Sequence, residues 1–562
     1  MSDATRGGER ELTIRALLAG CVFGALFTAA GVYIGLKSPF TESGLIPASV
    51  LSVALFTAIG RPMSAQEYNV SATCSGGAGA MAATAGLIGP VAAMSMMGHS
   101  YSGWVIAVMG LALGVFGVLL AVPLREPLVV DAKLPFPSGT AAGEVIRSMS
   151  AVDGGGPRHA RALMGGGAVA AILVWLRDGV PMLIPGSLDL PGRLGRSLAA
   201  SGFSLAVSPL LVATGALIGL HGALSMLGGT VLAWAVLAPR LADAAIIPSA
   251  SFEDGLGWLL WPGVALLVSS SLASLALQAR TLIRGARELG AAGAASGRRL
   301  LVAIGAMGAA VAVLAWLLLG VPLVLAVVVV LAMPLLTAAC ARAQGETDIA
   351  PVGPIGGLAQ IAIGSVARPS PATTLGGAMI VFGTANQATQ LMSSFKAGRV
   401  LGSSPRAVII SQLLGCVVGA VVAVPVYEVL TSAYQLGSTA LPAPAPMSWK
   451  ATAEAVTGGA AAMPHLAPLA AGIGAALGIL LALLGQTRAA RWLPSAPAVG
   501  IGLILPASYV VTIFLGGACI AALQWRRPAQ VEAYGAVVAG GVMAGEALLG
   551  VAIAICRVTG LL

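Results

Sequence analysis

Long apolar stretches, separated by short polar connections, follow one another along almost the whole chain. Stretches of about 20 apolar residues predict helices that cross a membrane, because that length spans the hydrocarbon core. They are much longer than the strands of a membrane β-barrel and do not alternate, so helices are the expected form. We expect about 12–16 crossings. The clearest candidates are residues 13–36, 101–123, 205–238, 258–278, 299–319, 320–340, 372–392, 407–427, 466–485, 499–523 and 534–556.

Shorter apolar segments are interrupted by glycine or proline and predict half-length helices or additional spans. They are residues 44–60, 69–96, 138–150, 160–176 and 350–366. Irregular backbone at membrane depth is tolerated only where protein or a water-filled cavity satisfies its polar groups. The predicted fold class is therefore all-α, a polytopic integral membrane protein with broken or re-entrant segments.

Composition and charge agree with a membrane protein. Hydrophobic residues make up 57% of the chain and charged residues only 9%, against about 25% charged residues in a soluble domain. The net charge is +9, which in a soluble protein would suggest nucleic-acid binding. Here the basic residues lie in short loops, so the positive-inside rule explains them better. The rule places the N-terminus and the arginine-rich loop at 280–299 in the cytoplasm, and residues 428–447 outside.

Two stretches of the chain resemble each other. When AQEYNV at 65–70 is placed over QGETDI at 344–349, Glu67 falls on Glu346 and Asn69 on Asp348. Further along, SPLLVATGALIGL resembles LPASYVVTIFLGG in the same order. We infer two homologous halves, and this gives the expected division of the chain: a cytoplasmic N-terminus at 1–11, a first half at 12–240, a linker with one span at 241–298, a second half at 299–556 and a tail at 557–562.

Internal repeats are common in secondary transporters, and broken segments in matching positions indicate the substrate site. The stretch GETDIAPVGPIGG at 345–357 is such a segment, with Glu346 and Asp348 at its start. The alternative is a surface loop in which both acids are solvated. The matching pair Glu67 and Asn69 in the other half favours a polar site.

The stretch LPFPSGTAAGEVIRS at 134–148 predicts a helix that starts after two prolines. Ser138 or Thr140 can cap this helix, and Glu144 then lies about one turn inside it. A helix start offers backbone N–H groups and the positive end of a dipole, which suit a carboxylate or another anion. The alternative is an ordinary capped helix with Glu144 at the surface.

Two further sets of polar residues fall inside apolar segments. Glu546 lies near the middle of the last predicted span, where a carboxylate costs about 2.5–3.5 kcal/mol. We predict that it faces the interior, as the proton-coupling group or as a substrate contact, with a buried structural hydrogen bond as the alternative. Asn386 and Gln390 are four residues apart, so they share a helix face and could line a polar pathway.

Motifs of several enzyme classes are missing from the sequence. It contains no P-loop, no HExxH and no nucleophile elbow, and its six cysteines form no CxxC or Cys/His cluster. We therefore expect no enzyme activity, no cofactor and no metal site, and an ion gradient as the energy source. A membrane-embedded enzyme and a channel are the less favoured alternatives.

Taken together, these motifs resemble the oligopeptide transporter family, which includes the yellow stripe-like metal-chelate transporters. The matching segments are QEYN at 66–69, LPFPSGTA at 134–141, GETDIAPVGPIG at 345–356, FKAGRVLGSSPR at 395–406, RWLPSAPAVGIGLILP at 491–506 and AGEALLGV at 544–551. The resemblance implies a secondary-active importer, typically driven by protons, with small peptides, peptide-like compounds or metal chelates as substrates and a homo-oligomer as one option. It places Glu67, Asn69, Ser138, Gly139, Thr140, Glu144, Glu346, Asp348 and Glu546 on shared motif positions.

One departure from the family pattern narrows the substrate. The chelate-transporting branch tends to carry acids just before the FK-G stretch, whereas this chain has Gln390 to Ser394, all neutral. We therefore expect a proton-coupled importer of small oligopeptides or peptide-like compounds that works by alternating access, with a metal-chelate importer as the alternative. The compact loops and the preference for arginine over lysine suggest the plasma membrane of a bacterium.

Overall fold

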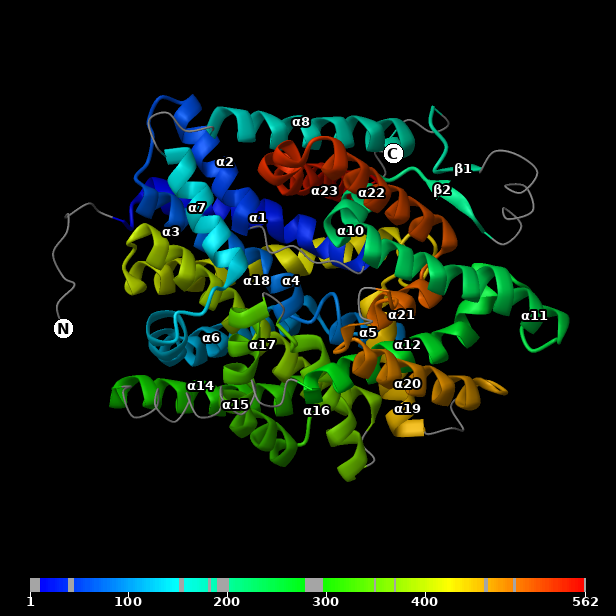
Figure 1. Cartoon of the computed structure of the whole chain (residues 1–562). Helices are drawn as coiled ribbons and strands as arrows, with labels where there is room; N and C mark the ends of the chain where they lie inside the picture. The colour runs from blue at the N-terminus through cyan, green and yellow to red at the C-terminus, as the bar shows by residue number, and fades with distance from the viewer. Residues whose placement is uncertain are drawn as a thin grey trace.

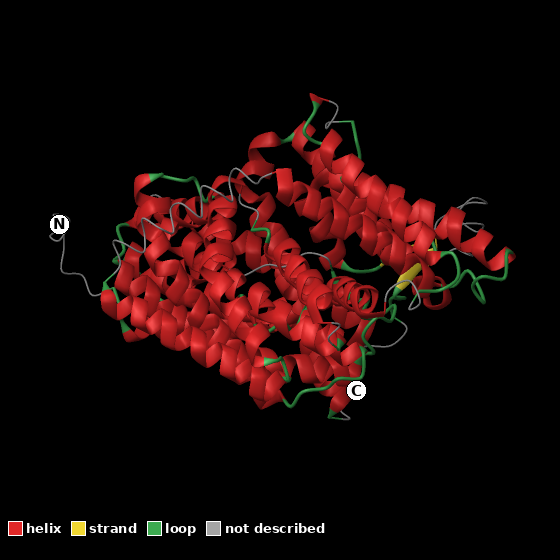
Figure 2. Cartoon of the chain, turned by 90° about the horizontal axis from the view of Figure 1, so that it is seen from below, coloured by secondary structure: helices red, strands yellow, loops and turns green. Residues whose placement is uncertain are grey.

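A computed structural model describes residues 11–38, 45–150, 156–179, 183–189, 202–277, 297–347, 350–367, 370–458, 463–488 and 492–559. Helices form nearly all of it (Figures 1 and 2). Eleven of the described helical segments are long and apolar enough to cross a membrane. The prediction of an all-α polytopic membrane protein is therefore confirmed.

The helices follow one another closely along the chain. The first group is α1 (Ile14–Lys37), α2 (Leu45–Ala58), α3 (Ala65–Gly79), α4 (Met81–Thr84), α5 (Pro90–Met96), α6 (Gly103–Arg125), the π-helix η1 (Glu126–Asp131), α7 (Pro137–Ser150), α8 (Gly156–Val174) and η2 (Trp175–Gly179). Two short antiparallel strands, β1 (Ser187–Asp189) and β2 (Ser204–Ala206), come next, followed by α10 (Pro209–Thr230), η3 (Val231–Leu237), α11 (Ala238–Asp243) and α12 (Phe252–Leu277).

The remaining helices begin after the linker. They are α14 (Arg298–Leu319), α15 (Leu323–Thr347), α16 (Val352–Ala367), α17 (Pro371–Leu401), α18 (Pro405–Ala433), α19 (Pro444–Gly458), α20 (Ala467–Leu484), α21 (Ala496–Ile504), α22 (Ala507–Arg526) and α23 (Pro528–Val558). Side chains on α14 and α20 such as Leu317 and Leu469 are more than half exposed. Apolar exposure of this kind suits a lipid-facing surface.

Helices are interrupted at several points, one of which lies in a segment that the sequence predicts to be broken. Between α3 and Gly86 the chain forms only the single helical turn α4. The chain then turns at Gly86, whose φ of 72° favours glycine. The helix α10 is kinked at Gly219, inside the predicted span 205–238. The predicted span 499–523 is not continuous, because an extended Leu505 separates α21 from α22. Because these breaks lie among packed helices, neighbouring elements surround their irregular backbone.

Glycine allows neighbouring helices to pack with their backbones almost in contact. The helix α10 lies along α22, where Gly215 faces the carbonyl of Ile513 and Gly516 faces that of Val212. The helix α8 lies along α23 in the same way. Close approach through small residues is typical of membrane helices, whose association depends on packing.

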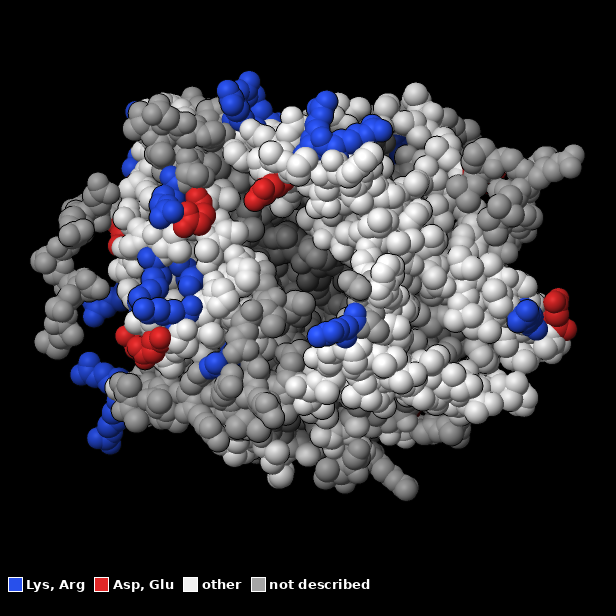
Figure 3. All heavy atoms as spheres, in the orientation of Figure 1, with Lys and Arg blue, Asp and Glu red and all other residues white. Residues whose placement is uncertain are grey.

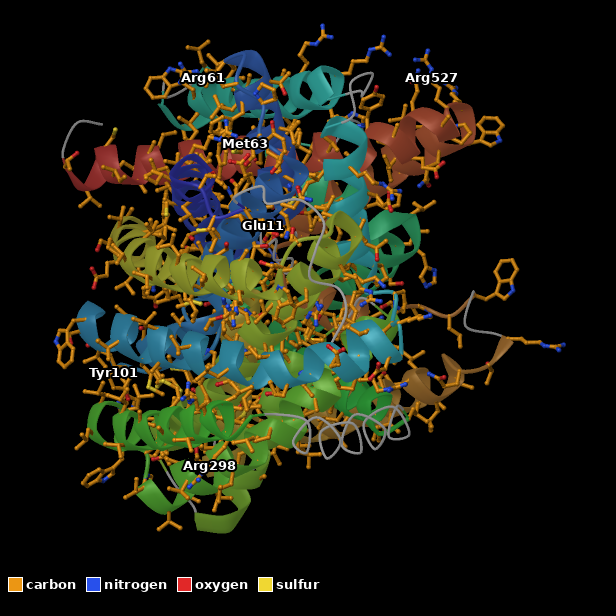
Figure 4. The ribbon with its side chains drawn as sticks, turned by 90° about the vertical axis from the view of Figure 1, so that its left-hand side faces the viewer. Glu11, Arg61, Met63, Tyr101, Arg298 and Arg527 are labelled. Atoms are coloured by element: carbon orange, nitrogen blue, oxygen red, sulfur yellow. The ribbon has the colours of Figure 1, made fainter. Side chains whose placement is uncertain are left out.

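Three helices begin at the same end of the molecule. Thr13 and Arg15 at the start of α1 donate hydrogen bonds to Glu67 at the start of α3, and Glu11 accepts one from the N–H group of Ser404, just before α18. In Figure 4, Glu11 and Met63 lie in the upper half of the view, above Tyr101 and Arg298. We call this end of α1, α3 and α18 the N-terminal face, and the opposite end, where α1 finishes, the far face.

Candidate functional site

The middle of α17 is unusually polar for a buried membrane helix, and it packs against the break after α3. The amide of Asn386 donates hydrogen bonds to the carbonyl of Ala80 (3.1 Å) and to the hydroxyl of Thr84 (3.2 Å). The role of Asn386 in a polar pathway stays a prediction. The broken segment thus presents backbone and hydroxyl groups that an unbroken helix would keep for itself.

Gln387 is fully buried beside Asn386 and ties three elements together. Its Nε2 donates to the carbonyl of Gly77 (3.2 Å), and its Oε1 accepts from the hydroxyl of Thr84 (3.0 Å). Gln390, one turn further along, lies against Gly76, where a Cβ atom would come within 2.6 Å of its Nε2. The two glycines of α3 therefore allow the glutamines of α17 to reach the α3 backbone.

Further along α17, three of the sequence motifs meet. The N–H group of Phe136, just before α7, donates to the carbonyl of Gly345 in α15 (3.0 Å). Lys396 donates to the carbonyl of Leu134 (2.8 Å), and Gln344 donates to the hydroxyl of Ser393 (3.2 Å). We call this region, made of residues 134–140, 344–345 and 386–396 with the facing residues of α3 and α4, the motif junction.

Buried polar atoms without a hydrogen-bond partner gather around the motif junction. Among the described residues they include Gln344 Oε1, Gln390 Nε2 and both amide atoms of Gln412 in α18. Gln412 lies against Gly77, as its contact with a Cβ at that position shows. An unpartnered buried polar atom costs about 1–3 kcal/mol. Such atoms around broken helices suit a site that a polar solute completes.

The start of α7 belongs to the motif junction, but its cap differs from the prediction. The helix begins at Pro137, so Ser138 and Thr140 lie in its first turn and the expected capping role is wrong. The Thr140 hydroxyl instead donates to the carbonyl of Pro135 (2.6 Å). Gly139 is buried against the carbonyl of Ser393, where a Cβ atom would come within 2.4 Å of the oxygen.

The predicted acids do not share one location. Glu144 is paired with Arg147 at 2.5 Å and its side chain is 47% exposed, so it lies outside the motif junction. Glu346 follows Gly345 directly in the last turn of α15. The side chain of Glu346 and the whole of Asp348 lie outside the described residues, so their roles stay predictions.

Glu67 and Asn69 lie at the N-terminal face. Glu67 forms a capping box with Ser64 and a two-point ion pair with Arg15, at 2.9 and 2.7 Å. It lies outside the candidate spans. Burial alone would raise its pKa, but hydrogen bonds from Arg15, Thr13 and Ser64 hold the pKa below its ordinary value. Asn69 donates to the hydroxyl of Ser403 (3.1 Å) and so helps to join α3 to the end of α17.

Glu546 is far along the chain from these motifs and fully buried in α23. Its two oxygens accept hydrogen bonds from the hydroxyl of Ser208 (2.8 and 2.9 Å), and one also accepts from the N–H group of Leu210 (2.8 Å). Lys37, at the end of α1, lies 3.1 Å away. The carboxylate therefore sits at the N-terminus of α10 with a cation beside it.

A second ion pair adjoins Glu546. Arg177 in η2 lies 3.5 Å from Glu546 and binds Asp178 through two nitrogens, at 2.8 and 2.5 Å. We call Lys37, Arg177, Asp178 and Glu546 the ion cluster. Sequence reasoning missed its two cations. They could have been found by asking which charges at the ends of spans must compensate a carboxylate in the last span.

Comparisons with known proteins cover nearly the whole chain. A family model described as an oligopeptide transporter protein matches residues 11–557. The chain belongs to the oligopeptide transporter family. A provisionally named oligopeptide transporter of Haemophilus influenzae is 27% identical, with 93% of this chain and 92% of that protein aligned. A similarly named protein of Saccharomyces cerevisiae is 23% identical over 90% of each chain.

The family also contains relatives with another kind of name. A protein of Oryza sativa, provisionally named a metal-nicotianamine transporter, is 22% identical, with 96% of this chain and 86% of that protein aligned. The resemblance inferred from the motifs is therefore confirmed. Within this oligopeptide transporter family protein, the motif junction unites three of the segments that carried the resemblance.

Proposed function

We propose that this protein imports small oligopeptides or peptide-like compounds by alternating access, driven by protons. The observation that carries the proposal is the motif junction, where polar side chains with unpartnered atoms lie around the broken segment after α3 and the last turns of α15. Internal breaks of this kind mark the substrate sites of secondary transporters. The name of the Haemophilus influenzae relative supports peptides as substrates.

At the motif junction, neutral groups would hold a peptide backbone. Gln390 can donate and Gln344 can accept, and these are the two functions that a peptide group needs from its partners. The start of α7 and the ammonium group of Lys396 would favour a negatively charged substrate group. Glu346 and Asp348, at the end of α15 and after it, are proposed to complete the site.

Glu546 is proposed as the proton-coupling group. Protonation would remove the charge that Lys37 and Arg177 compensate, and so would release two cations at the far face. The N-terminus is proposed to be cytoplasmic, which places the far face outside the cell. The protein is proposed to lie in the plasma membrane of a bacterium.

Import of metal chelates is the second candidate, favoured by the names of the Oryza sativa relatives. No cluster of three His, Cys, Asp or Glu side chains able to hold a metal occurs in the part of the chain that the structure describes. A chelated metal brings its own ligands, so this candidate requires recognition of the chelator. The neutral stretch from Gln390 to Ser394 on α17 favours peptides over chelates.

Thermal unfolding of the purified protein tests the substrate class. A ligand of the native state raises the apparent stability by about 2.7 kcal/mol at 100 times its Kd. We expect di- to pentapeptides to raise the melting temperature, and Gln390→Leu to weaken that shift without lowering the melting temperature of the free protein. A shift with iron chelates alone would contradict the peptide proposal and support the second candidate.

A further inference from the structure

A cavity of about 550 Å³ opens beside the ion cluster, away from the motif junction. Its walls come from the ends of α1, η2, α18 and α23, the starts of α10 and α22, and the β1–β2 hairpin. Its charged lining residues are Lys37, Arg177, Asp178 and Arg557, and three tyrosines, Tyr33, Tyr434 and Tyr509, also face it. Pockets for small ligands have volumes of about 300–1,000 Å³, so the cavity can hold a small peptide.

The charges around this cavity do not balance. In the ion cluster, the two cations Lys37 and Arg177 face the two carboxylates of Asp178 and Glu546. Arg557 adds a third cation, and its hydrogen bonds go to neutral oxygens, the Tyr434 hydroxyl at 3.4 Å and the Asp178 carbonyl at 3.5 Å. Within the described residues, no carboxylate lies within ion-pair distance of Arg557.

Arg557 is exposed, but its guanidinium group is positioned at the edge of the cavity. Its guanidinium group lies 5.6 Å from the centre of the Tyr434 ring, a cation–π distance. Below it, Lys37 has three N–H donors and uses two of them, on Tyr33 and Glu546. Its side chain is 8% exposed, and it lines the cavity. Two cations with unused donors therefore line one cavity, with Lys37 buried in its wall and Arg557 at its exposed edge.

We propose that this cavity is a binding site for the carboxylate end of the transported solute, with Arg557 as its main cation and Lys37 as the second. A guanidinium group can bind a carboxylate through two parallel hydrogen bonds. The tyrosine hydroxyls would form hydrogen bonds with the peptide groups next to that carboxylate. The proposal rests on the proposed function for the identity of the solute, but the charge imbalance is independent of it.

The position of the cavity suits the first encounter with substrate. Lys37 ends α1, whose other end lies beside Glu67 at the N-terminal face. With the N-terminus in the cytoplasm, the cavity lies at the outer end of the protein. A carboxylate bound there would also approach the cations that compensate Glu546. Substrate capture and the proposed proton site would then share Lys37.

Binding of dialanine and of dialanine amide to the purified protein tests this site. The two probes differ only in the terminal carboxylate, so we expect the acid to bind at least about tenfold more tightly, which corresponds to about 1.4 kcal/mol. Arg557→Gln is expected to remove this preference, and Arg557→Lys to restore part of it. Arg527→Gln, an exposed arginine at the other end of α23, is the matched control and should bind both probes as the original protein does.

Three results would overturn the site. The acid and the amide could bind equally, neither could bind, or Arg527→Gln could lose the preference for the acid as Arg557→Gln does. Inorganic phosphate is the probe for a free anion. If it binds with the same dependence on Arg557 while dialanine does not, the cavity is an inorganic anion site and the proposal is wrong. Uptake of dialanine without a preference for the acid would refute this site alone. Binding with the expected preference but without uptake would refute the proposed function and leave the site standing.

Discussion

The motif junction and the ion cluster are both buried and polar, but they differ in how far their polar groups are paired. At the junction the groups are mostly neutral amides and hydroxyls, several atoms have no partner, and the helices around them are broken. In the ion cluster each charge faces an opposite charge, and Glu546 accepts hydrogen bonds at both oxygens. On the face drawn in Figure 3, a hollow opens near the centre, and acidic and basic side chains lie at its rim.

This contrast suggests a division of tasks. A matched set of buried charges holds one arrangement firmly, because removal of any member leaves another charge uncompensated. Unpartnered neutral groups cost less and can exchange partners with a passing solute. The ion cluster therefore joins α1, η2, α10 and α23 in the state described here, whereas the junction is the place where a substrate can bind.

The largest effect is expected from Glu546→Gln. It leaves Lys37 and Arg177 facing a neutral amide, and loss of one partner of a buried ion pair costs about 3–5 kcal/mol. We expect a strongly lowered melting temperature of the purified protein. The double variant Lys37→Met with Glu546→Gln should be more stable than the sum of the two single effects predicts.

The same variant tests the proton-coupling proposal. If Glu546→Gln folds and still takes up its substrate with an unchanged dependence on the proton gradient, the coupling role is wrong. If instead its stability equals that of the original protein, the ion cluster does not hold these helices together, and the contrast between the two regions fails.

A smaller loss of stability is expected at the motif junction from Gly139→Val. The new side chain would press on the carbonyl of Ser393, and overpacking costs about 1–3 kcal/mol. Gly165→Ala in α8, where no atom lies within 4 Å of the new Cβ, is the control and should unfold like the original protein. We expect uptake to fall in the first variant and to persist in the second. Equal unfolding temperatures for both would show that α7 is not packed against α17 as described.

Glu67→Gln should cost about 1–2 kcal/mol, through loss of the capping box and of the ion pair with the partly exposed Arg15. Because the folded protein holds the pKa of Glu67 below its ordinary value, the carboxylate stabilises the protein near neutral pH. This stabilisation is lost as the pH falls from about 4.3 through the lower folded value. The melting-temperature difference between the original protein and the variant should therefore be constant from pH 8 to 6 and shrink in acid. A difference that grows in acid would contradict the sign of the shift.

The smallest effect on stability is expected from Gln390→Leu. Its Nε2 has no partner, so the substitution removes a buried donor without breaking a bond through that atom. We expect the free energy of unfolding to stay the same or to rise, because the cost of the unpartnered donor is removed, while substrate affinity falls. Gln387→Leu is the comparison, since it breaks bonds to Gly77 and Thr84 and should destabilise the protein. The opposite order of stabilities would contradict the assignment of these two glutamines.

Much of the fold could be predicted from the sequence, because the length of an apolar stretch and the cost of unpaired backbone in a bilayer decide it. The breaks after α3 and α15 were predicted from the glycine and proline residues that interrupt these apolar segments. The cap of α7 was misplaced by at least two residues, since the helix begins at Pro137, directly after Phe136 with its φ of 40°. The division into two homologous halves stays a prediction.

The site was predictable as a set of motifs but not as an arrangement. Nothing local in the sequence shows that Phe136 bonds to Gly345, or that Lys37 reaches Glu546 across 509 positions of the chain. Gln344 and Gln412 were missed because a single amide in an apolar helix carries no periodic signal. Gln344 and Gln412 can be recognised only in the structure, where several helices bring their unpartnered atoms together.

Uptake of labelled dialanine into proteoliposomes tests the central claim most directly. With an inward proton gradient, we expect saturable uptake that collapses when a protonophore is added. In Gln390→Leu, the apparent affinity for dialanine should fall at least tenfold, a change of about 1.4 kcal/mol. Arg527→Gln should behave as the original protein does. Uptake that is unsaturable, indifferent to the gradient, or equal in Gln390→Leu would contradict a proton-driven carrier with its substrate site at the motif junction.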